Sequence, residues 1–318
     1  MRCLNFTVRI ALLFAVAILN PLTSLAAEKA AWALVRVSVA NVREEPSHAA
    51  EMGSQVIMGT PVKLGDYNNG WWSVETPEGY KGYIIDNSLK PVTNSRIGKW
   101  RRSRRLIVTS PDQTYIFEKP ADSDPLTRVT DVVNGSILQA DGDSVAGFWP
   151  VRLPDGRTGF IATRDAALFE RGVYCGDCMH GVVDFAGRLM GVPYLWGGTS
   201  SKSMDCSGLS KISYLSQGVI LPRNASQQAK IGIEVDADDS LQAGDLIFFG
   251  NKTTGRINHV GIYIGGDHYI HSSGRVRISS LNRADSDFEA ACIIAVRRLT
   301  PADIDRLSLF NHGWFFER

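Results

Sequence analysis

The sequence predicts two small β-barrels followed by an α+β domain, and two observations lead to this fold class. Two stretches in the first half, residues 70–84 and 147–161, repeat one another at a constant offset of 77 positions. After residue 178 the pattern changes to helical spacing and then to several strand-like runs. Helices that precede an antiparallel sheet are typical of an α+β domain.

The first residues have the pattern of an export signal. Arg2 and Arg9 give a positive start, residues 10–19 are apolar, and residues 24–27 include the small residues expected at a cleavage site. The apolar run is too short for a permanent bilayer span, although an N-terminal membrane anchor is the alternative. We therefore expect a signal peptide over residues 1–27 and an exported protein, periplasmic or secreted, with no integral membrane segment after cleavage.

Each repeat is predicted to be a compact β module, the first over residues 28–97 and the second over residues 104–170. Short strands surround a tight turn in both, Pro77–Gly79 in the first and Pro154–Gly156 in the second. Short strands with closely spaced turns favour small β-barrels. Between the modules lies Trp100–Arg105, "WRRSRR", which we interpret as a solvated linker. The formal net charge of the whole chain is only +1, which argues against a nucleic-acid partner.

Two helices and a sheet are predicted for the second half. The first helix has Val182, Ala186 and Leu189 at helical spacing. A second helix follows Cys206 and stops near Gly218. Strand-like runs then cover residues 244–250, 259–266, 268–274 and 291–299.

Cys206 stands where the second helix should begin. Asp205 is a good N-cap residue, which puts Cys206 at the first helical position. The helix dipole favours a thiolate there, and amides of the first turn could line an oxyanion hole. Gly197 and Gly198 would let the preceding backbone approach closely. The alternative is a buried structural cysteine.

Two histidines supply what a thiol nucleophile needs, a proton acceptor and an orienting group. His259 opens one predicted strand, His271 lies in the next, and Gly265–Asp267 between them predicts a hairpin. Such a hairpin would set the imidazoles side by side, with His259 facing Cys206 and His271 holding the other ring nitrogen. Taken alone, a histidine that opens a strand is more often a surface or packing residue.

Four segments together resemble the NlpC/P60 cysteine peptidases, whose catalytic domain is papain-like: "PYLWGGTSSKSMDCSGL", "LQAGDLIFFG", "INHVGIYIGG" and "YIHSSG". We assign this domain to residues 178–300. The resemblance implies that Cys206 is the nucleophile, His259 the base and acid, and His271 the third polar member. Asp205 and Ser207 match substrate-contacting positions beside the nucleophile.

The two β modules resemble bacterial SH3-like (SH3b) domains, and the whole arrangement is similar to γ-D-glutamyl-L-diamino acid endopeptidases. This resemblance implies a murein peptide substrate, L-Ala-γ-D-Glu-diamino acid, cut in cell-wall turnover or recycling without a cofactor or metal. In that group the first SH3b module closes one end of the cleft and recognises the free amino group of L-Ala. Tyr80 and Glu45 are the matching residues, although Glu44 could be the one that points inward.

Tyr80 has independent support, because the second repeat has Arg157 at the same offset and the fold therefore does not demand a tyrosine. Arg223 matches another substrate-binding position, while Asn224 and Ala225 stand where some relatives have Asp-Ser. Hydrolysis of intact or cross-linked peptidoglycan is an alternative function. A non-catalytic protein that binds the cell wall through its SH3b modules is another.

Three further cysteines outside the signal peptide have no place in this scheme. Cys175 and Cys178 could form a disulfide in an oxidising compartment or a redox motif, and the additional cysteines of a zinc site are missing. Cys292 is expected in a core strand. The aromatic residues of the tail, residues 301–318, are expected to pack on a domain. The sequence leaves the oligomeric state open.

Overall fold

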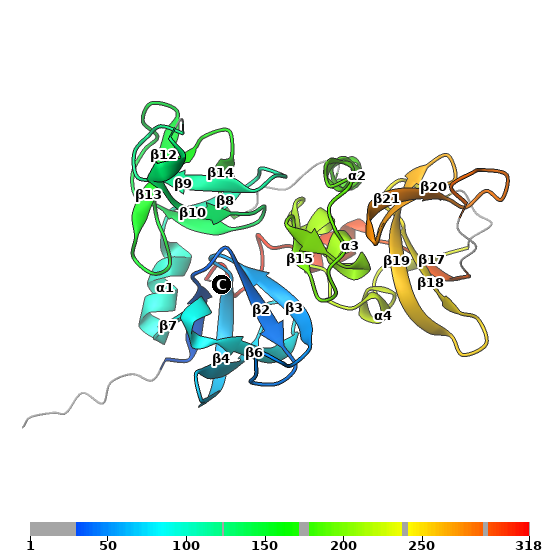
Figure 1. The fold of residues 1–318 in the computed structure, drawn as a ribbon, viewed down its shortest axis with the longest axis horizontal. Helices are drawn as coiled ribbons and strands as arrows, with labels where there is room; N and C mark the ends of the chain where they lie inside the picture. The colour runs from blue at the N-terminus through cyan, green and yellow to red at the C-terminus, as the bar shows by residue number, and fades with distance from the viewer. Residues whose placement is uncertain (1–29, 123, 172–177, 237–240, 289–291, 318) are drawn as a thin grey trace, which may run out of the picture.

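The computed structural model describes residues 30–122, 124–171, 178–236, 241–288 and 292–317. The predicted signal peptide lies outside these residues, as does Cys175 of the predicted disulfide. Figure 1 shows the two β modules at one end of the molecule and the domain that carries Cys206 at the other.

The first β module is a curled antiparallel sheet with the strand order β3-β2-β6-β5-β4-β1-β7. Apolar side chains on its inner face, among them Val35, Val42 and Ile84, are fully buried. Its strands are β1 (Trp32–Val35), β2 (Val39–Arg43), β3 (Met52–Ile57), β4 (Pro61–Asn68), β5 (Trp71–Glu75), β6 (Lys81–Ile85) and β7 (Leu89–Val92), with a 3₁₀ turn, η1, at Asp86–Ser88.

The second β module repeats the topology of the first. Its order, β10-β9-β13-β12-β11-β8-β14, is the same order with seven added to each strand number. Strand β12 follows β5 at an offset of 77 residues, as does β13 after β6, so the predicted repeat is confirmed. The strands are β8 (Arg105–Val108), β9 (Thr114–Phe117), β10 (Arg128–Val132), β11 (Ile137–Ala140), β12 (Phe148–Arg152), β13 (Thr158–Ala162) and β14 (Ala166–Leu168), with η2 at Pro125–Thr127.

The remaining domain places two helices before a six-stranded antiparallel sheet, as predicted. The helices are α2 (Cys178–Arg188) and α3 (Cys206–Leu215), and the sheet order is β17-β22-β18-β19-β20-β21. Helix α3 packs on the sheet through Leu209 and Ile212, which share a core with Val260 and Ile270. The other elements are β15 (Thr199–Ser200), β16 (Ser203–Met204), α4 (Ala225–Gln228), β17 (Ile233–Val235), β18 (Leu246–Asn251), β19 (Arg256–Gly265), β20 (His268–Ser273), β21 (Arg275–Ser280), β22 (Ile293–Arg298) and α5 (Pro301–Arg306).

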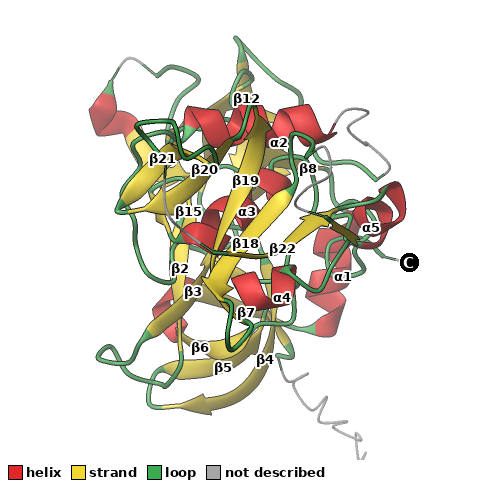
Figure 2. Cartoon of the chain, turned by 90° about the vertical axis from the view of Figure 1, so that its right-hand side faces the viewer, coloured by secondary structure: helices red, strands yellow, loops and turns green. Residues whose placement is uncertain are grey.

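Helix α3 lies on the side of this sheet that faces the β modules, while β18, β19 and β22 are turned toward the viewer in Figure 2. The four predicted strands correspond to β18, β19, β20 and β22, whereas β17 and β21 were not predicted. Cys292 corrects another prediction, because it is exposed and precedes β22 instead of lying in a core strand.

The prediction of a solvated linker at Trp100–Arg105 is wrong. Helix α1 (Asn94–Arg102) runs through this segment and buries Trp100, and Arg105 is only 2% exposed. The Arg105 guanidinium lies 4.5 Å from the ring centroid of Trp100 and 4.8 Å from that of Phe316, and it donates to the carbonyl oxygen of Phe315 at 2.7 Å. Trp100 and Arg105 are buried because the aromatic tail folds back over them, while Arg102 and Arg104 of the same segment are exposed.

The tail packs on the body of the protein, as expected. Leu309, Phe315 and Phe316 share one buried cluster with Leu34 of the first module and Ile220 of the Cys206 domain. The tail therefore joins parts of the chain that are far apart in sequence.

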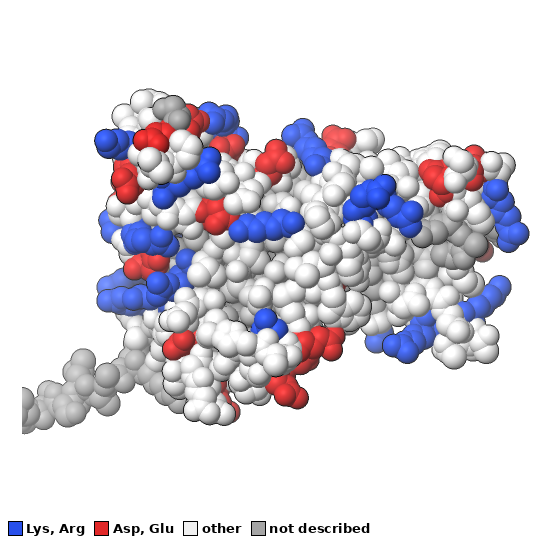
Figure 3. Space-filling view, in the orientation of Figure 1, with Lys and Arg blue, Asp and Glu red and all other residues white. Residues whose placement is uncertain are grey.

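The surface has no dominant charge on the face drawn in Figure 3, where acidic and basic side chains occur in small, mixed groups. This distribution agrees with the small net charge of the chain. Within the described residues, none of the helices has the length and apolar content needed to cross a bilayer.

Candidate active site

Helix α3 begins at Cys206, and Asp205 is its N-cap, as predicted. The Asp205 carboxylate accepts hydrogen bonds from the Gly208 amide at 2.7 Å and from the Gly197 amide at 3.0 Å. A Cβ at Gly197 would lie 2.1 Å from the carbonyl oxygen of Met52 in the first β module, and the φ of Gly197 is +78°. Only glycine fits there, so this loop approaches the first module as closely as the sequence suggested.

The sulfur of Cys206 is largely buried and faces β19. The backbone groups of Val260 and Ser207 lie beside it and lower the pKa of the thiol. Burial, and then the charge of Asp205, nevertheless raise the pKa of the thiol to about 11. Burial therefore outweighs the helix-terminus effect that the sequence suggested, and the resting group is a thiol that needs a base.

The hairpin of β19 and β20 brings the two predicted histidines together. Nε2 of His259 lies 2.7 Å from Nδ1 of His271, and Nε2 of His271 lies 3.0 Å from the hydroxyl of Ser279 on β21. His259 directly precedes Val260 on β19, the residue whose backbone lies beside the Cys206 sulfur. His271 is fully buried and can orient the His259 ring from behind.

A buried ion pair supports the loop that leads to Cys206. Arg223 is 2% exposed, and its two terminal nitrogens donate to the Asp205 carboxylate at 2.5 Å and 3.1 Å. It also donates to the Ser207 hydroxyl at 2.8 Å. The three residues predicted from the catalytic domain to bind substrate thus form one network beside Cys206, in which the charge of Asp205 is matched by that of Arg223.

The pocket that contains Cys206 has a volume of about 340 Å³ and is walled by two parts of the chain. The first β module supplies one wall, including Tyr80, whose hydroxyl donates to the Glu44 carboxylate. Burial, and then that carboxylate, raise the pKa of Tyr80. The residues that line the pocket are Glu44, Glu51, Gly53 and Tyr80 from the first module, and Tyr194, Trp196, Asp205, Cys206, Ser207, Arg223, Asn224, Ala225, Ser226, Arg256, Ile257 and Asn258.

Of the two neighbouring glutamates that the sequence offered, Glu44 is among the residues that line this pocket and Glu45 is not, although both are exposed. The pairing of β2 with β3 slips between Val42 and Arg43, and beyond the slip the Glu44 amide bonds to the carbonyl oxygen of Glu51 at 3.0 Å. Such an irregularity changes which residues face one side of a strand, and alternation in the sequence does not reveal it.

Sequence reasoning missed several lining residues, among them Trp196, Tyr194 and Glu51. The indole Nε1 of Trp196 donates to Glu51 at 2.7 Å, which links the two walls of the pocket. Burial, and then Cys206 and Asp205, raise the pKa of Tyr194 to about 12. Both aromatic residues lie in "PYLWGG", directly before the nucleophile loop, and that position was the available signal. For Glu51 the sequence offers no comparable signal.

Two other predictions concern metals and the paired cysteines. In the described part of the chain, His268, Asp285 and Asp287 form the one group spaced closely enough to hold a metal ion, and none of them lines the Cys206 pocket. Cys178 is buried at the start of α2. Its predicted disulfide partner lies outside the described residues.

Comparisons with known proteins agree with this architecture. Residues 191–294 match the NlpC/P60 family, and residues 38–90 match the bacterial SH3 domain. A protein named dipeptidyl-peptidase 6 from Lysinibacillus sphaericus is 29% identical over 266 residues, which are 79% of this chain and 92% of that relative. A protein named γ-D-glutamyl-L-lysine dipeptidyl-peptidase from Bacillus cereus is 28% identical over 236 residues, which are 71% of this chain and 68% of that relative.

A solved structure shows the same fold. The crystal structure of an NlpC/P60 family protein from Bacillus cereus aligns with a TM-score of 0.71 at 22% identity, covering 85% of this chain and 100% of that one. The chain therefore contains an NlpC/P60 domain with a bacterial SH3 domain ahead of it, and together with the named relatives this supports a cysteine peptidase of that type.

Proposed function

We propose that this peptidase hydrolyses the γ-D-glutamyl-diamino acid bond of murein peptides with a free N-terminal L-Ala, in cell-wall peptide turnover or recycling. The observation that carries the proposal is the wall that Glu44, Glu51 and Tyr80 of the first module build at the Cys206 pocket. Two relatives named as dipeptidyl-peptidases, one of them for a γ-D-glutamyl-L-lysine substrate, support the same bond and product.

The wall suits an ammonium group. A charge buried in a closed pocket needs an opposite charge, because leaving it unpaired costs several kcal/mol. Asp205 is already matched by Arg223, so Glu44 and Glu51 are the carboxylates of this wall that can receive the amino group of L-Ala. An acetylated or sugar-linked amino terminus would lack the charge and add bulk. Free peptides should therefore be cut in preference to intact peptidoglycan.

Acylation begins with proton transfer, because a thiol whose pKa is about 11 is a weak nucleophile at neutral pH. The Cys206 proton passes to His259 as the sulfur attacks the γ-carbonyl carbon of D-Glu. The carbonyl oxygen becomes an oxyanion, to which we assign the Cys206 amide in the first turn of α3 as a donor. His271, held by Ser279, orients His259 and stabilises its imidazolium form.

Collapse of the tetrahedral intermediate breaks the C–N bond. His259 gives its proton to the amine of the diamino acid, which leaves, and a thioester joins Cys206 to the D-Glu γ-carbonyl. A water molecule then gives a proton to His259 and attacks the thioester carbon. The C–S bond breaks, the proton returns to sulfur, and L-Ala-D-Glu is released with a free γ-carboxyl group.

We further propose that residues 1–27 direct export to the periplasm or the medium, because the proposed substrate is a fragment of the cell wall. The pattern of charged, apolar and small residues supports this. The mass of the protein recovered from cells tests it. A chain that starts near residue 28 is expected, and a full-length chain retained in the cytoplasm would contradict it.

The function is tested by mass spectrometry of three substrates: L-Ala-γ-D-Glu-diaminopimelate, its N-acetylated form, and purified sacculi. The free-amine peptide should be cut between D-Glu and diaminopimelate, and Cys206→Ala should abolish the cut. Equal cutting of the two peptides would contradict recognition of the ammonium group but would still support a peptidase. Cutting of sacculi alone would favour the intact-wall hydrolase, and no cutting at all would favour a wall-binding protein.

A further inference from the structure

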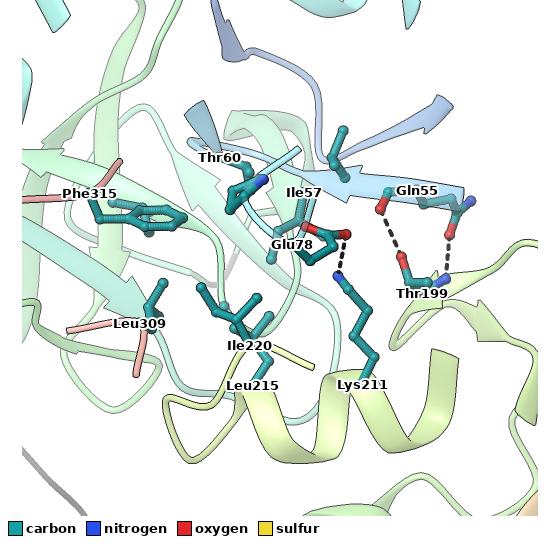
Figure 4. A pocket seen from close by; sticks show the side chains of 14 residues that line it. Gln55, Ile57, Thr60, Glu78, Thr199, Lys211, Leu215, Ile220, Leu309 and Phe315 are labelled. Atoms are coloured by element: carbon teal, nitrogen blue, oxygen red, sulfur yellow. Dashed lines mark hydrogen bonds and ion pairs between the residues drawn. The ribbon is translucent and has the colours of Figure 1, made fainter. Parts of the chain in front are cut away.

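A small cavity lies where the parts of the chain meet, and Figure 4 shows it from close by. The first module contributes Ile57, the second contributes Ile137, the catalytic domain contributes Leu215, and the tail contributes Phe315. Its volume of about 40 Å³ is far below the size of an ordinary ligand site, which is about 300 Å³ or more. The cavity is therefore a junction and not a second pocket for substrate.

An ion pair lies in this apolar junction. Nζ of Lys211 on α3 is 3.1 Å from Oε1 of Glu78 in the first module, and the side chains are only 11% and 4% exposed. Figure 4 shows the two side chains pointing toward one another across the domain boundary. Among the described residues Oε1 of Glu78 has no hydrogen-bond partner, so the charge of Lys211 is what compensates this carboxylate oxygen.

Stability alone is a weak reason for such a pair. Apolar side chains of similar volume in the same place are often as stabilising as a buried ion pair, because both charges must be stripped of water. A buried pair does, however, fix the separation of its two elements, since attraction in a poorly solvated site depends steeply on distance. This pair joins helix α3 to the turn of the first module that contains Glu78.

Glu78 is tied rigidly to the substrate wall. It lies in the turn from Thr76 to Tyr80, where the Thr76 amide donates to the Tyr80 carbonyl oxygen at 2.9 Å and the Tyr80 amide donates to the Thr76 hydroxyl at 3.2 Å. Thr76 is fully buried. A shift of the turn that carries Glu78 would therefore move Tyr80 with it, together with Glu44, to which the Tyr80 hydroxyl donates.

Lys211 is tied equally rigidly to the nucleophile. It follows Cys206 by five residues on α3, an axial distance of about 7.5 Å at 1.5 Å per residue. A second link runs parallel to the ion pair: the Thr199 amide donates to the Gln55 side chain at 3.0 Å, and the Thr199 hydroxyl donates to the Gln55 carbonyl oxygen at 2.9 Å. Gln55 is on β3, which also carries Gly53 of the wall.

We propose that Glu78 and Lys211 are positioning residues that set the separation between the substrate wall and Cys206. By doing so they decide how strongly the enzyme prefers a free amino terminus over a blocked one. The inference rests on the proposed function, because the wall has this role only if it receives the ammonium of the peptide.

The test measures binding separately from cleavage. In the full-length Cys206→Ala protein, calorimetry gives the Kd of L-Ala-γ-D-Glu-diaminopimelate and of its N-acetylated form. Glu78→Gln and Lys211→Met should each reduce the ratio of the two Kd values about tenfold or more. Exchanging the charges, Glu78→Lys with Lys211→Glu, should recover much of the ratio. The matched control is Glu75→Gln, which removes a half-exposed ion pair of the same module and should leave the ratio unchanged.

Folding is followed by the melting temperature of each variant. If a single variant fails to fold, the double variant Glu78→Gln with Lys211→Met leaves no unpaired buried charge, and its Kd ratio should still fall. Kd ratios within about twofold of that of the Cys206→Ala protein, with only the melting temperatures changed, would overturn the inference. A Cys206→Ala protein that binds both peptides equally would overturn it as well. Failure of the proposed reaction is a separate result: the wild type would cut neither peptide while the binding ratio still responds to Glu78 and Lys211.

Discussion

Replacing Asp205 with Asn should destabilise the protein. Asparagine is as good an N-cap as aspartate, so α3 keeps its start, and the change removes the charge and one of the two acceptor oxygens. Arg223, 2% exposed, then loses the carboxylate that both its terminal nitrogens contact. Removing one partner of a buried ion pair costs about 3–5 kcal/mol. At about 2–4 °C per kcal/mol, the melting temperature should fall by roughly 6–20 °C.

The same variant should make Cys206 easier to ionise. Asp205 is the second cause, after burial, of the raised pKa of this thiol, and Arg223 acts in the opposite direction. Without the Asp205 charge, both the lost repulsion and the unmatched guanidinium favour the thiolate. The pH midpoint of alkylation by iodoacetamide should therefore fall below that of the wild type, although the fold has become less stable.

Thermal unfolding and the pH dependence of alkylation, followed by mass spectrometry, check the two effects. The control is Asp205→Asn with Arg223→Met, which removes both charges and should recover most of the melting temperature. If the Asp205→Asn protein has the melting temperature of the wild type, the change does not leave Arg223 as a costly unpaired charge, and the reasoning is refuted. An unchanged alkylation midpoint would refute the influence of Asp205 on the thiol.

Three further predictions follow from the same geometry. Because burial raises the pKa of Cys206 from about 9 to about 11, the wild type should lose about 2–3 kcal/mol of stability relative to Cys206→Ala as pH rises through that interval. If the free energies of unfolding of the two proteins in denaturant differ by the same amount at every pH, this prediction is wrong. Glu44→Gln should raise KM for the free-amine peptide about tenfold, the effect of one charged contact, whereas Glu45→Gln should not. Equal effects of the two changes in steady-state kinetics would contradict the assignment of Glu44 as the residue that receives the ammonium group. Ending the chain at residue 313 removes the buried Phe315 and Phe316, so the protein should lose about 3–6 kcal/mol; an unchanged melting temperature would show that the tail does not contribute.

The positions of Cys206, His259 and His271 could be predicted because local sequence determines where they lie. Asp205 caps α3, and the glycines at the end of β19 allow a hairpin that brings His259 within reach of His271. The ionisation of Cys206 could not be predicted in the same way. It depends on how deeply the sulfur is buried against β19, and that is a property of the packed domain.

The substrate wall was predicted only in part, for two physical reasons. Tyr80, which the repeat singled out, lines the pocket, whereas of the two neighbouring glutamates only Glu44 does, beyond a register slip between β2 and β3 that the sequence does not reveal. Contacts between domains produce no periodic spacing of apolar residues in the sequence. The basic segment that contains Arg105 therefore suggested solvent exposure, although aromatic residues more than 200 positions away bury it.

The two repeats use the same turn in different ways. In the first, Tyr80 reaches the Cys206 pocket, whereas Arg157 at the matching position of the second bonds to Asp155 at 2.8 Å. Asp155 also lies 3.9 Å from Arg36 of the first module. None of the lining residues described for the Cys206 pocket comes from the second module.

The second module instead contacts the parts that form the pocket. Its Asp131 accepts a hydrogen bond from Ser38 of the first module at 2.8 Å and pairs with Lys202 of the catalytic domain at 2.5 Å. The Ile137 amide also donates to the Met58 carbonyl oxygen at 2.9 Å. A wall made by one domain for the nucleophile of another is useful only if their separation is fixed. The second copy of the barrel therefore has a physical role as a brace, even though it presents no side chain to the pocket.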